Sequence, residues 1–110
     1  MKYKKAIGDY GEDFASSLLT EMGYEIMERN FWTKLGEIDI IARKDQTLHF
    51  IEVKTRTQST YGFPAESVTR DKLDKMKKAA QIYMSNRRLY WRSVSFDVFE
   101  VMTNMISNCI

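Results

Sequence analysis

The chain has 110 residues, a net charge of +2 and a single cysteine, Cys109. This length suits one domain with its own core and leaves no room for a second, while 44% hydrophobic and 29% charged residues argue against intrinsic disorder. One cysteine excludes an internal disulfide and a cysteine-based zinc site. No apolar run reaches the ~18 residues of a membrane span, and the start, MKYKKAIGDYGED, is too polar for a signal peptide. We therefore expect a cytoplasmic protein with no membrane partner.

The first predicted element is an amphipathic helix over residues 9–22, DYGEDFASSLLTEM. Large apolar residues recur at steps of four, and two more widen the stripe: Tyr10, Phe14, Leu18 and Met22, with Ala15 and Leu19. Gly23 is placed to end this helix as its C′ residue. Glu12 falls just beyond the edge of the apolar arc, so we expect its carboxylate against the rim of the sheet.

Three strands are predicted next. YEIMERNFW, residues 24–32, alternates loosely; GEIDIIAR, residues 36–43, follows Gly36; and the polar turn KDQT leads into LHFIEVKTR, residues 48–56. Short connections between consecutive strands predict an antiparallel meander.

The second half of the chain contains a loop, a helix and a strand. QSTYGFPAES, residues 58–67, reads as a loop, and an apolar stripe of Leu73, Met76, Ala80 and Tyr83 predicts a helix from about Thr69 to Asn86 with its lysines outward. VSFDVFEV, Val94 to Val101, follows this crossover and is expected to pair parallel with a meander strand. The tail MTNMISNCI fits a strand extension, a frayed end or a partner contact. The sequence thus predicts an α/β fold, a single domain of residues 1–110 whose α-β-β-β-α-β core, about residues 8–101, is a mixed sheet flanked by helices.

Charged residues interrupt two of these strands. In FIEVKTR, Glu52 and Lys54 share a face about 6.7 Å apart, which is twice the rise per residue. Alternation in the preceding strand predicts one face with Glu37, Asp39 and Ile41 and another with Ile38, Ile40 and Ala42. If Asp39 and Glu52 lie on the same side of paired strands, two carboxylates and one ammonium group converge.

Such a pair of carboxylates is stabilised by a cation, and carboxylate oxygens are the ligands that Mg²⁺ prefers. We interpret Asp39 and Glu52 as ligands of Mg²⁺ or Mn²⁺. Lys54 then orients a water molecule or stabilises charge on a phosphate, and Glu12 adds a further acid. The alternative is a solvated Glu52 and Lys54 pair of little consequence.

Basic residues concentrate in the second half of the chain. Residues 70–92 contain eight lysines and arginines against Asp71 and Asp74. This run predicts phosphate contacts with a nucleic acid or, alternatively, a solvated helix face. The candidates for nucleic-acid binding are Arg56, Arg70, Lys72, Lys75 and Lys78. Lys72, at the start of the predicted helix, either contacts the carboxylate site or is solvated.

Five other side chains keep two interpretations. Trp32, Tyr61 and Phe63 are able to stack on bases or pack in the core or loop. Asp97 joins the acidic cluster or pairs with a buried basic group. His49 is a surface strand residue or a general base, and the first is expected.

The motifs also carry a family resemblance. GEIDII followed by EVKTR, with twelve residues between Asp39 and Glu52, resembles the PD-(D/E)xK restriction-endonuclease-like superfamily. GDYGEDFA, GYEIMERNFW, GEIDIIA, FIEVKTR, YGFPAESV and FDVFEV resemble, in order, the YraN family, which is similar to archaeal Holliday-junction resolvases. The resemblance implies metal ligands at Asp39 and Glu52, a catalytic Lys54 and an additional acid at Glu12. Ile38 stands where the superfamily label has proline.

The resemblance further implies a Mg²⁺-dependent endonuclease that cleaves DNA, with branched DNA as one candidate substrate and a homodimer as one candidate assembly. Two other functions remain open. One is a nucleic-acid-binding module of the same fold with little turnover; the other is a protein-interaction domain whose charges are solvated.

Overall fold

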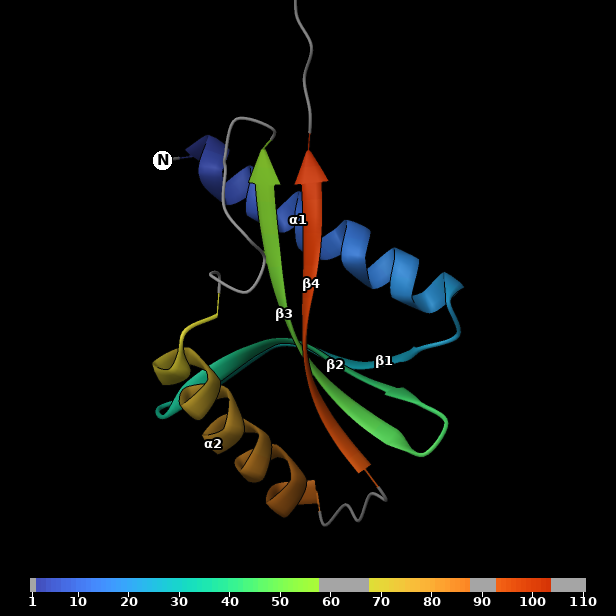
Figure 1. Cartoon of the computed structure of the whole chain (residues 1–110), viewed down its shortest axis with the longest axis vertical. Coiled ribbons are helices and arrows are strands. Elements are labelled where there is room, and N and C mark those ends of the chain that lie inside the picture. The colour runs from blue at the N-terminus through green and yellow to red at the C-terminus, as the bar shows by residue number, and fades with distance from the viewer. Residues whose placement is uncertain (1, 58–67, 88–92, 104–110) are drawn as a thin grey trace, which may run out of the picture.

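The computed structural model describes residues 2–57, 68–87 and 93–103 (Figure 1). The elements, in chain order, are α1 (Lys2–Glu21), β1 (Glu25–Thr33), β2 (Gly36–Lys44), β3 (Thr47–Thr57), α2 (Arg70–Arg87) and β4 (Ser93–Thr103). The strands form one open sheet in the order β1-β2-β3-β4, antiparallel except for the parallel pair β3 and β4. The α/β fold, the element order and the parallel last strand are confirmed. The predicted loop at 58–67 and the end of the tail lie outside the described residues.

The two helices pack on opposite faces of the sheet. Buried side chains form two clusters because successive strand residues point to alternate faces. The α1 cluster contains Ala15, Leu19, Ile40, Ala42, Ile51, Val53 and Val101. The α2 cluster contains Ile38, Ile41, Leu48, Phe50, Ala79, Ala80 and Tyr83. Neither helix in the described part of the chain has the length and apolar character needed to cross a membrane.

Helix α1 differs from its prediction at both its start and its buried face. It begins at Lys2, about two turns earlier than expected, and it ends before Gly23, whose φ of 92° fits the C′ role. The large residues of the predicted stripe are exposed: Tyr10, Phe14, Leu18 and Met22. The buried positions are instead the small Gly11 and Ala15, together with Leu19. Small residues face the sheet because α1 crosses β3 closely.

Gly11 makes this close crossing possible. A Cβ atom at Gly11 would overlap the Oγ1 atom of Thr55 on β3. Gly36, which begins β2, has the same relation to the backbone of Lys75 on α2. The first contact sets α1 against β3, and the second sets the turn between β1 and β2 against α2.

The sheet forks at the position of the predicted carboxylates. Pairing between β2 and β3 runs from Lys44 with Thr47 to Ile40 with Ile51 and stops there. Beyond that point β2 continues only with β1, and β3 continues only with β4, so the two strand pairs diverge (Figure 1). Asp39 and Glu52 are the first residues after the last pair.

The predicted alternation in β2 is wrong at Asp39. Ile38 packs with Ile41 on the α2 side, whereas Ile40 faces α1. The partner strand β1 contains the physical reason: Asn30, which the flanking pairs place opposite Asp39, has a left-handed φ of 53°. Asparagine tolerates this conformation better than most residues. At this point the side chains of β1 and β2 change faces, so that Ile38 and Ile40 lie on opposite sides of the sheet with Asp39 between them.

Candidate functional site

The Asp39 carboxylate lies in the fork and is held there by the neighbouring strand. Its Oδ2 accepts a hydrogen bond of 2.8 Å from the backbone amide of Val53. In a continuing β ladder this amide would bond to a β2 carbonyl. Because β2 turns away at this point, the Asp39 side chain satisfies the amide instead, which fixes the carboxylate beside Glu52.

Glu52 is the most buried carboxylate of the site, with 6% of its side chain exposed. Its Oε1 lies 4.0 Å from Nζ of Lys54 on the same strand and 3.5 Å from Nζ of Lys72 on α2. Its Oε2 is buried and has no hydrogen-bond partner among the residues that the structure describes. The predicted convergence of an acid and an ammonium group is therefore present, with a second ammonium group added by α2.

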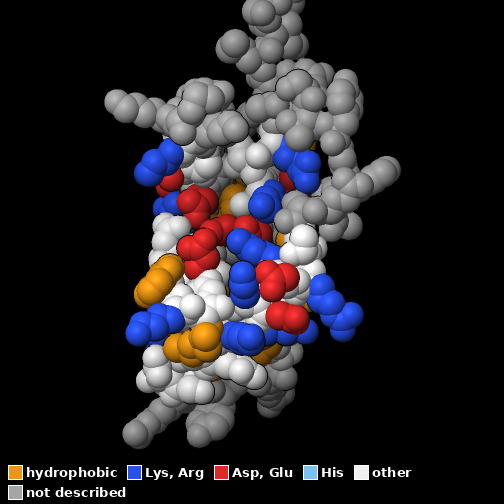
Figure 2. All heavy atoms as spheres, turned by 90° about the vertical axis from the view of Figure 1, so that its left-hand side faces the viewer, with side chains coloured by type: hydrophobic (Ala, Val, Ile, Leu, Met, Phe, Trp, Pro, Cys, Tyr) orange, Lys and Arg blue, Asp and Glu red, His pale blue; other side chains and the backbone are white. Residues whose placement is uncertain are grey.

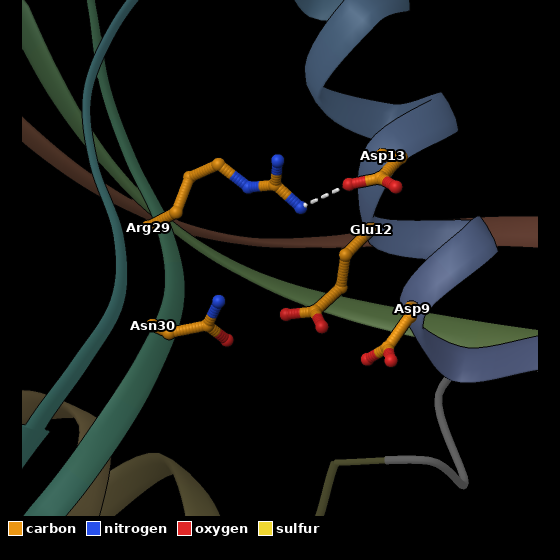
Figure 3. A pocket seen from close by; sticks show the side chains of 5 residues that line it. All are labelled: Asp9, Glu12, Asp13, Arg29 and Asn30. Atoms are coloured by element: carbon orange, nitrogen blue, oxygen red, sulfur yellow. Dashed lines mark hydrogen bonds and ion pairs between the residues drawn. The ribbon is translucent and has the colours of Figure 1, made fainter. Parts of the chain in front are cut away.

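Glu12 approaches the fork from α1 because Gly11 allows the helix to lie close to β3. Its Oε1 is also buried without a described hydrogen-bond partner. Next to it is a cavity of about 380 Å³ between α1 and β1, into which the side chains in Figure 3 point. The cavity is lined by Asp9, Glu12, Asp13, Arg29 and Asn30.

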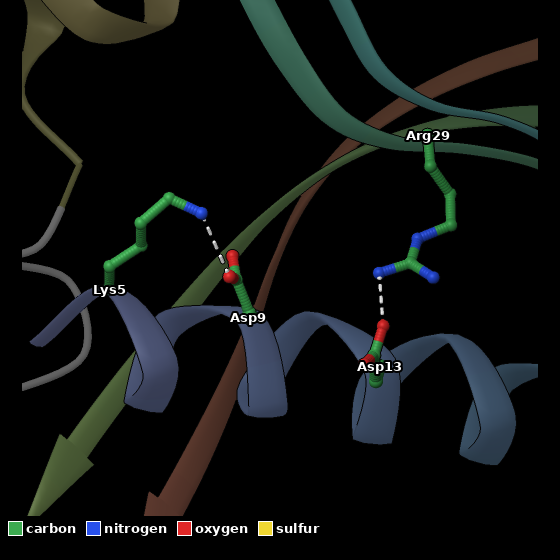
Figure 4. Close-up of polar contacts among 4 residues, drawn as sticks. All are labelled: Lys5, Asp9, Asp13 and Arg29. Atoms are coloured by element: carbon green, nitrogen blue, oxygen red, sulfur yellow. Dashed lines mark hydrogen bonds and ion pairs between the residues drawn. The ribbon is translucent and has the colours of Figure 1, made fainter. Parts of the chain in front are cut away.

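Two ion pairs neutralise the outer part of this cavity (Figure 4). Lys5 Nζ lies 3.1 Å from Asp9 Oδ2, and Arg29 Nη2 lies 2.8 Å from Asp13 Oδ1. Glu12 forms no such ion pair with the lysines and arginines that the structure describes. Of the three helical acids that line the cavity, Glu12 is therefore the one directed to the fork without a salt-bridge partner among the described residues.

Burial raises the pKa of each of the three carboxylates, Glu12, Asp39 and Glu52, above the ordinary value for that residue type. For Glu52, burial and the charge of Asp39 raise the pKa, while Lys72 and Lys54 oppose the rise. Burial raises the pKa of Asp39, and the amide of Val53 and the two lysines oppose it. Burial and Asp39 raise the pKa of Glu12, against the influence of Arg29. Burial is the largest cause of the raised pKa for each of the three carboxylates.

These residues fit a divalent cation. Raised carboxylate pKa values and an unpartnered buried oxygen on Glu52 are the features that a bound cation would relieve. Within the described part of the chain, no three Asp, Glu, His or Cys side chains converge closely enough to hold an ion by themselves. Two carboxylates supplemented by water are nevertheless a common protein contribution to a Mg²⁺ site. Asp39 and Glu52 are the residues that would hold the ion.

The predicted phosphate-contact residues separate into three groups. Lys72 lies at the site, whereas Arg70, Lys75 and Lys78 are exposed on α2. Arg56 Nε lies 2.8 Å from Glu100 Oε1, and both side chains are only 16% exposed. Figure 2 shows the resulting surface, on which acidic side chains gather at the centre with basic side chains around them.

The structure also bears on the two interpretations for three of the five other side chains. Asp97 lies apart from the acidic cluster: it is 2.6 Å from Nδ1 of His49 and accepts a hydrogen bond of 2.6 Å from Oγ of Ser95. His49 is therefore half-buried rather than a surface residue. Trp32 is 68% exposed, so core packing is excluded for it. Tyr61 and Phe63 lie outside the described residues.

Sequence reasoning missed Arg29 and Asn30, and it left Lys72 with two interpretations, a contact with the site or a solvated side chain. Asn30 carried a weak signal, since asparagine is depleted in strand interiors and enriched at left-handed φ. Arg29 carried none, because its approach to Glu12 depends on how α1 packs. The contact of Lys72 with Glu52 selects the first of its two interpretations, and it depends on how α2 packs.

Comparison with known proteins shows the family of this chain. The model of the group described as "Uncharacterised protein family UPF0102" matches residues 11–101, which include all of the site carboxylates and both lysines. A UPF0102 protein of Dictyoglomus turgidum is 44% identical over 98 residues, covering 89% of this chain and 83% of that protein. A UPF0102 protein of Clostridium perfringens is 48% identical over 100 residues, covering 91% and 82%. One of Clostridium kluyveri is 46% identical over 102 residues, covering 93% and 84%. This chain belongs to the UPF0102 family.

Proposed function

We propose that this protein is a divalent-cation-dependent endonuclease that hydrolyses phosphodiester bonds in DNA. The observation that carries the proposal is the arrangement at the fork, where the Asp39 and Glu52 carboxylates lie beside the ammonium groups of Lys54 and Lys72. Metal-dependent phosphodiester hydrolysis uses carboxylates that hold a cation and positive groups that face the phosphate. The resemblance to the PD-(D/E)xK superfamily agrees with this chemistry.

Each site residue has a separate task in the proposal. Asp39 and Glu52 hold Mg²⁺ or Mn²⁺, which when bound supplies Lewis-acid stabilisation of the phosphate and an acidified water. Lys54, whose side chain is 38% exposed, presents its ammonium group to the phosphate oxygen on which charge develops. Glu12 is placed to orient a water molecule from the α1 side, since its buried Oε1 has no described protein donor.

The exposed basic residues of α2 would bind the DNA backbone. Arg70, Lys75 and Lys78 are exposed on the helix whose first turn supplies Lys72 to the site. Contacts of this kind recognise phosphates rather than bases, so they favour recognition of DNA shape over sequence. Branched DNA is the candidate substrate that suits this mode, and the homodimer implied by the resemblance stays a prediction.

The test is incubation of the purified protein with linear, flapped and four-way DNA in Mg²⁺ or Mn²⁺. We expect cleavage by the wild type and a loss of about 100-fold or more in Glu52→Ala and Lys54→Ala. Equal cleavage by wild type and variants would identify a contaminating nuclease. Salt-sensitive binding to DNA without cleavage of any substrate would favour the second candidate, a binding module that keeps the fold.

A further inference from the structure

Lys72 differs from the other lysines of α2 in what its ammonium group faces. The hydroxyl of Thr69 accepts a hydrogen bond of 3.1 Å from the Lys72 amide, which fixes the first turn of the helix. From this turn, Lys72 Nζ reaches within 3.5 Å of Glu52 Oε1, closer than Lys54 at 4.0 Å. Lys75, one turn further, pairs instead with the exposed Asp71 at 3.1 Å.

The Glu52 carboxylate depends on Lys72 for stabilisation because few other polar groups surround it. The side chain is nearly buried, Asp39 adds a like charge beside it, and Oε2 has no described hydrogen-bond partner. A carboxylate removed from water is strongly destabilised unless a countercharge accompanies it. In the protein without a metal ion, two lysines from different elements supply that countercharge.

The charges at the fork indicate what a cation would change. Counted in their charged forms, the carboxylates of Glu12, Asp39 and Glu52 and the ammonium groups of Lys54 and Lys72 sum to one negative charge. A divalent cation would make the site positive by one charge, and a single phosphodiester group would neutralise it. Lys72 therefore assists a phosphate but opposes the cation, because the cation and Lys72 share the Glu52 carboxylate.

We propose that Lys72 is a positioning residue that competes with the divalent cation for Glu52 and so sets the affinity of the site for metal. The inference rests on the proposed function, since it takes Glu52 as a metal ligand. It assigns Lys72 to the interior of the site, in contrast to Lys75 and Lys78, which serve the outer face of α2.

The experiment measures Mn²⁺ binding to the full chain by calorimetry, without DNA. Lys72→Met keeps most of the side-chain length and removes the charge, and we expect it to bind Mn²⁺ about 3- to 10-fold more tightly than the wild type. Lys75→Met is the matched control and should stay within about 2-fold, because its ammonium group pairs with Asp71 in solvent. Lys72→Arg retains the charge and should resemble the wild type.

The outcomes separate the inference from the proposed function. If the wild type binds Mn²⁺, Glu52→Gln does not, and Lys72→Met binds with unchanged or weaker affinity, the competition is disproved while the metal site stands. If neither the wild type nor any variant binds Mn²⁺, the metal site of the proposed function fails and the competition fails with it.

A second measurement tests the contact itself in EDTA. Thermal unfolding of wild type, Lys72→Met, Glu52→Gln and the double variant forms a cycle. We expect Lys72→Met to lower Tm by about 4 °C or more in the wild type and by less than about 1 °C in the Glu52→Gln protein. Equal shifts in the two backgrounds would overturn the assignment of Lys72 as the partner of Glu52.

Discussion

Glu52 combines a buried side chain with a charge that the fold only partly compensates. Lys54 and Lys72 face one of its oxygens, and the other oxygen is buried without a described partner. Active sites often contain groups that are less stable in the folded protein than a neutral residue would be. The loss of folding stability caused by the buried charge of Glu52 can therefore be measured.

The first prediction concerns the pH dependence of stability without metal. Burial raises the pKa of Glu52 above its ordinary value of 4.5, so the folded state binds its proton more tightly than the unfolded state does. The contribution of Glu52 to stability is thus fully present below about 4.5 and is lost as the pH rises through the raised pKa. Glu52→Gln does not titrate, so its stability relative to the wild type should increase with pH over that window.

Urea unfolding in EDTA at several pH values between about 4 and 8 measures this difference. A difference between variant and wild type that is flat, or that falls as the pH rises, would contradict the burial of an ionisable Glu52. Addition of Mn²⁺ at the upper end of the range should stabilise the wild type and leave Glu52→Gln unchanged, which ties the effect to the site.

Asn30 provides the second prediction, because it carries the backbone reversal opposite Asp39. At a φ of 53°, a β-branched residue is strained, whereas glycine is not. We expect Asn30→Val to lower the free energy of unfolding by about 1–2 kcal/mol and Asn30→Gly to change it by a few tenths. Chemical denaturation measures both changes in the free energy of unfolding. Equal losses in the two variants would show that stability does not depend on the positive φ at position 30.

At the scale of the elements, the position of α1 depends on small side chains. Gly11 and Ala15 face the sheet while the larger Phe14 and Leu18 remain exposed. This inversion of the usual amphipathic pattern brings the helix axis close to β3 and brings Glu12 to the fork. The packing of a whole element therefore decides whether one carboxylate belongs to the site.

The third prediction compares two glycines of α1. A Cβ at Gly11 would overlap Thr55, whereas a Cβ at Gly8 would meet no atom within 4 Å. Gly11→Ala should therefore destabilise the protein by about 1–3 kcal/mol and weaken Mn²⁺ binding. Gly8→Ala should stabilise it by up to about 1 kcal/mol, since alanine is the better helix former.

Thermal unfolding and calorimetry give the two readouts for these variants. Adding Thr55→Ala to Gly11→Ala removes the overlapping oxygen and should restore part of both losses. A Gly11→Ala protein as stable as Gly8→Ala would mean that the contact between α1 and β3 is not close.

For the whole molecule, acidic side chains gather at the centre of one face with basic side chains around them (Figure 2), while α2 exposes Asp71 and Asp74 beside its lysines. The net charge of +2 conceals this arrangement. Under the proposed function, the basic side chains would attract a polyanion, and one of its phosphates would approach the carboxylates that would hold a cation. Such an arrangement makes binding dependent on salt.

The fourth prediction is a steep salt dependence of DNA affinity, from which individual contacts can be removed. Each lysine that contacts a phosphate contributes about 0.9 to the slope of log K against log salt. Lys78→Ala should lower the slope by about that amount. Arg43→Ala is the control, because Arg43 forms an ion pair with Glu25 and lies where β2 and β3 are still paired, away from the fork. Fluorescence anisotropy with labelled duplex DNA measures the slopes. Equal changes in Lys78→Ala and Arg43→Ala would contradict a role of α2 in binding the DNA backbone.

The sequence by itself determined the order of the elements, the crossover to a parallel last strand and the residue types of the site. These features follow from local signals: apolar periodicity identified the second helix, the polar turn identified the hairpin, and the spacing of Asp39, Glu52 and Lys54 fixed their adjacency in the meander. Local spacing was sufficient because residues on neighbouring strands of a meander meet by chain connectivity alone.

Only the tertiary structure decided which face each side chain occupies and which distant residues reach the fork. The period of two failed at Asp39 because Asn30, nine residues earlier, reverses the paired strands. The period of 3.6 selected the wrong face of α1 because the close contact of Gly11 with Thr55 admits only small side chains. Lys72 joined Glu52 through the docking of α2. Each outcome depends on packing between elements far apart in the chain, which no local pattern encodes.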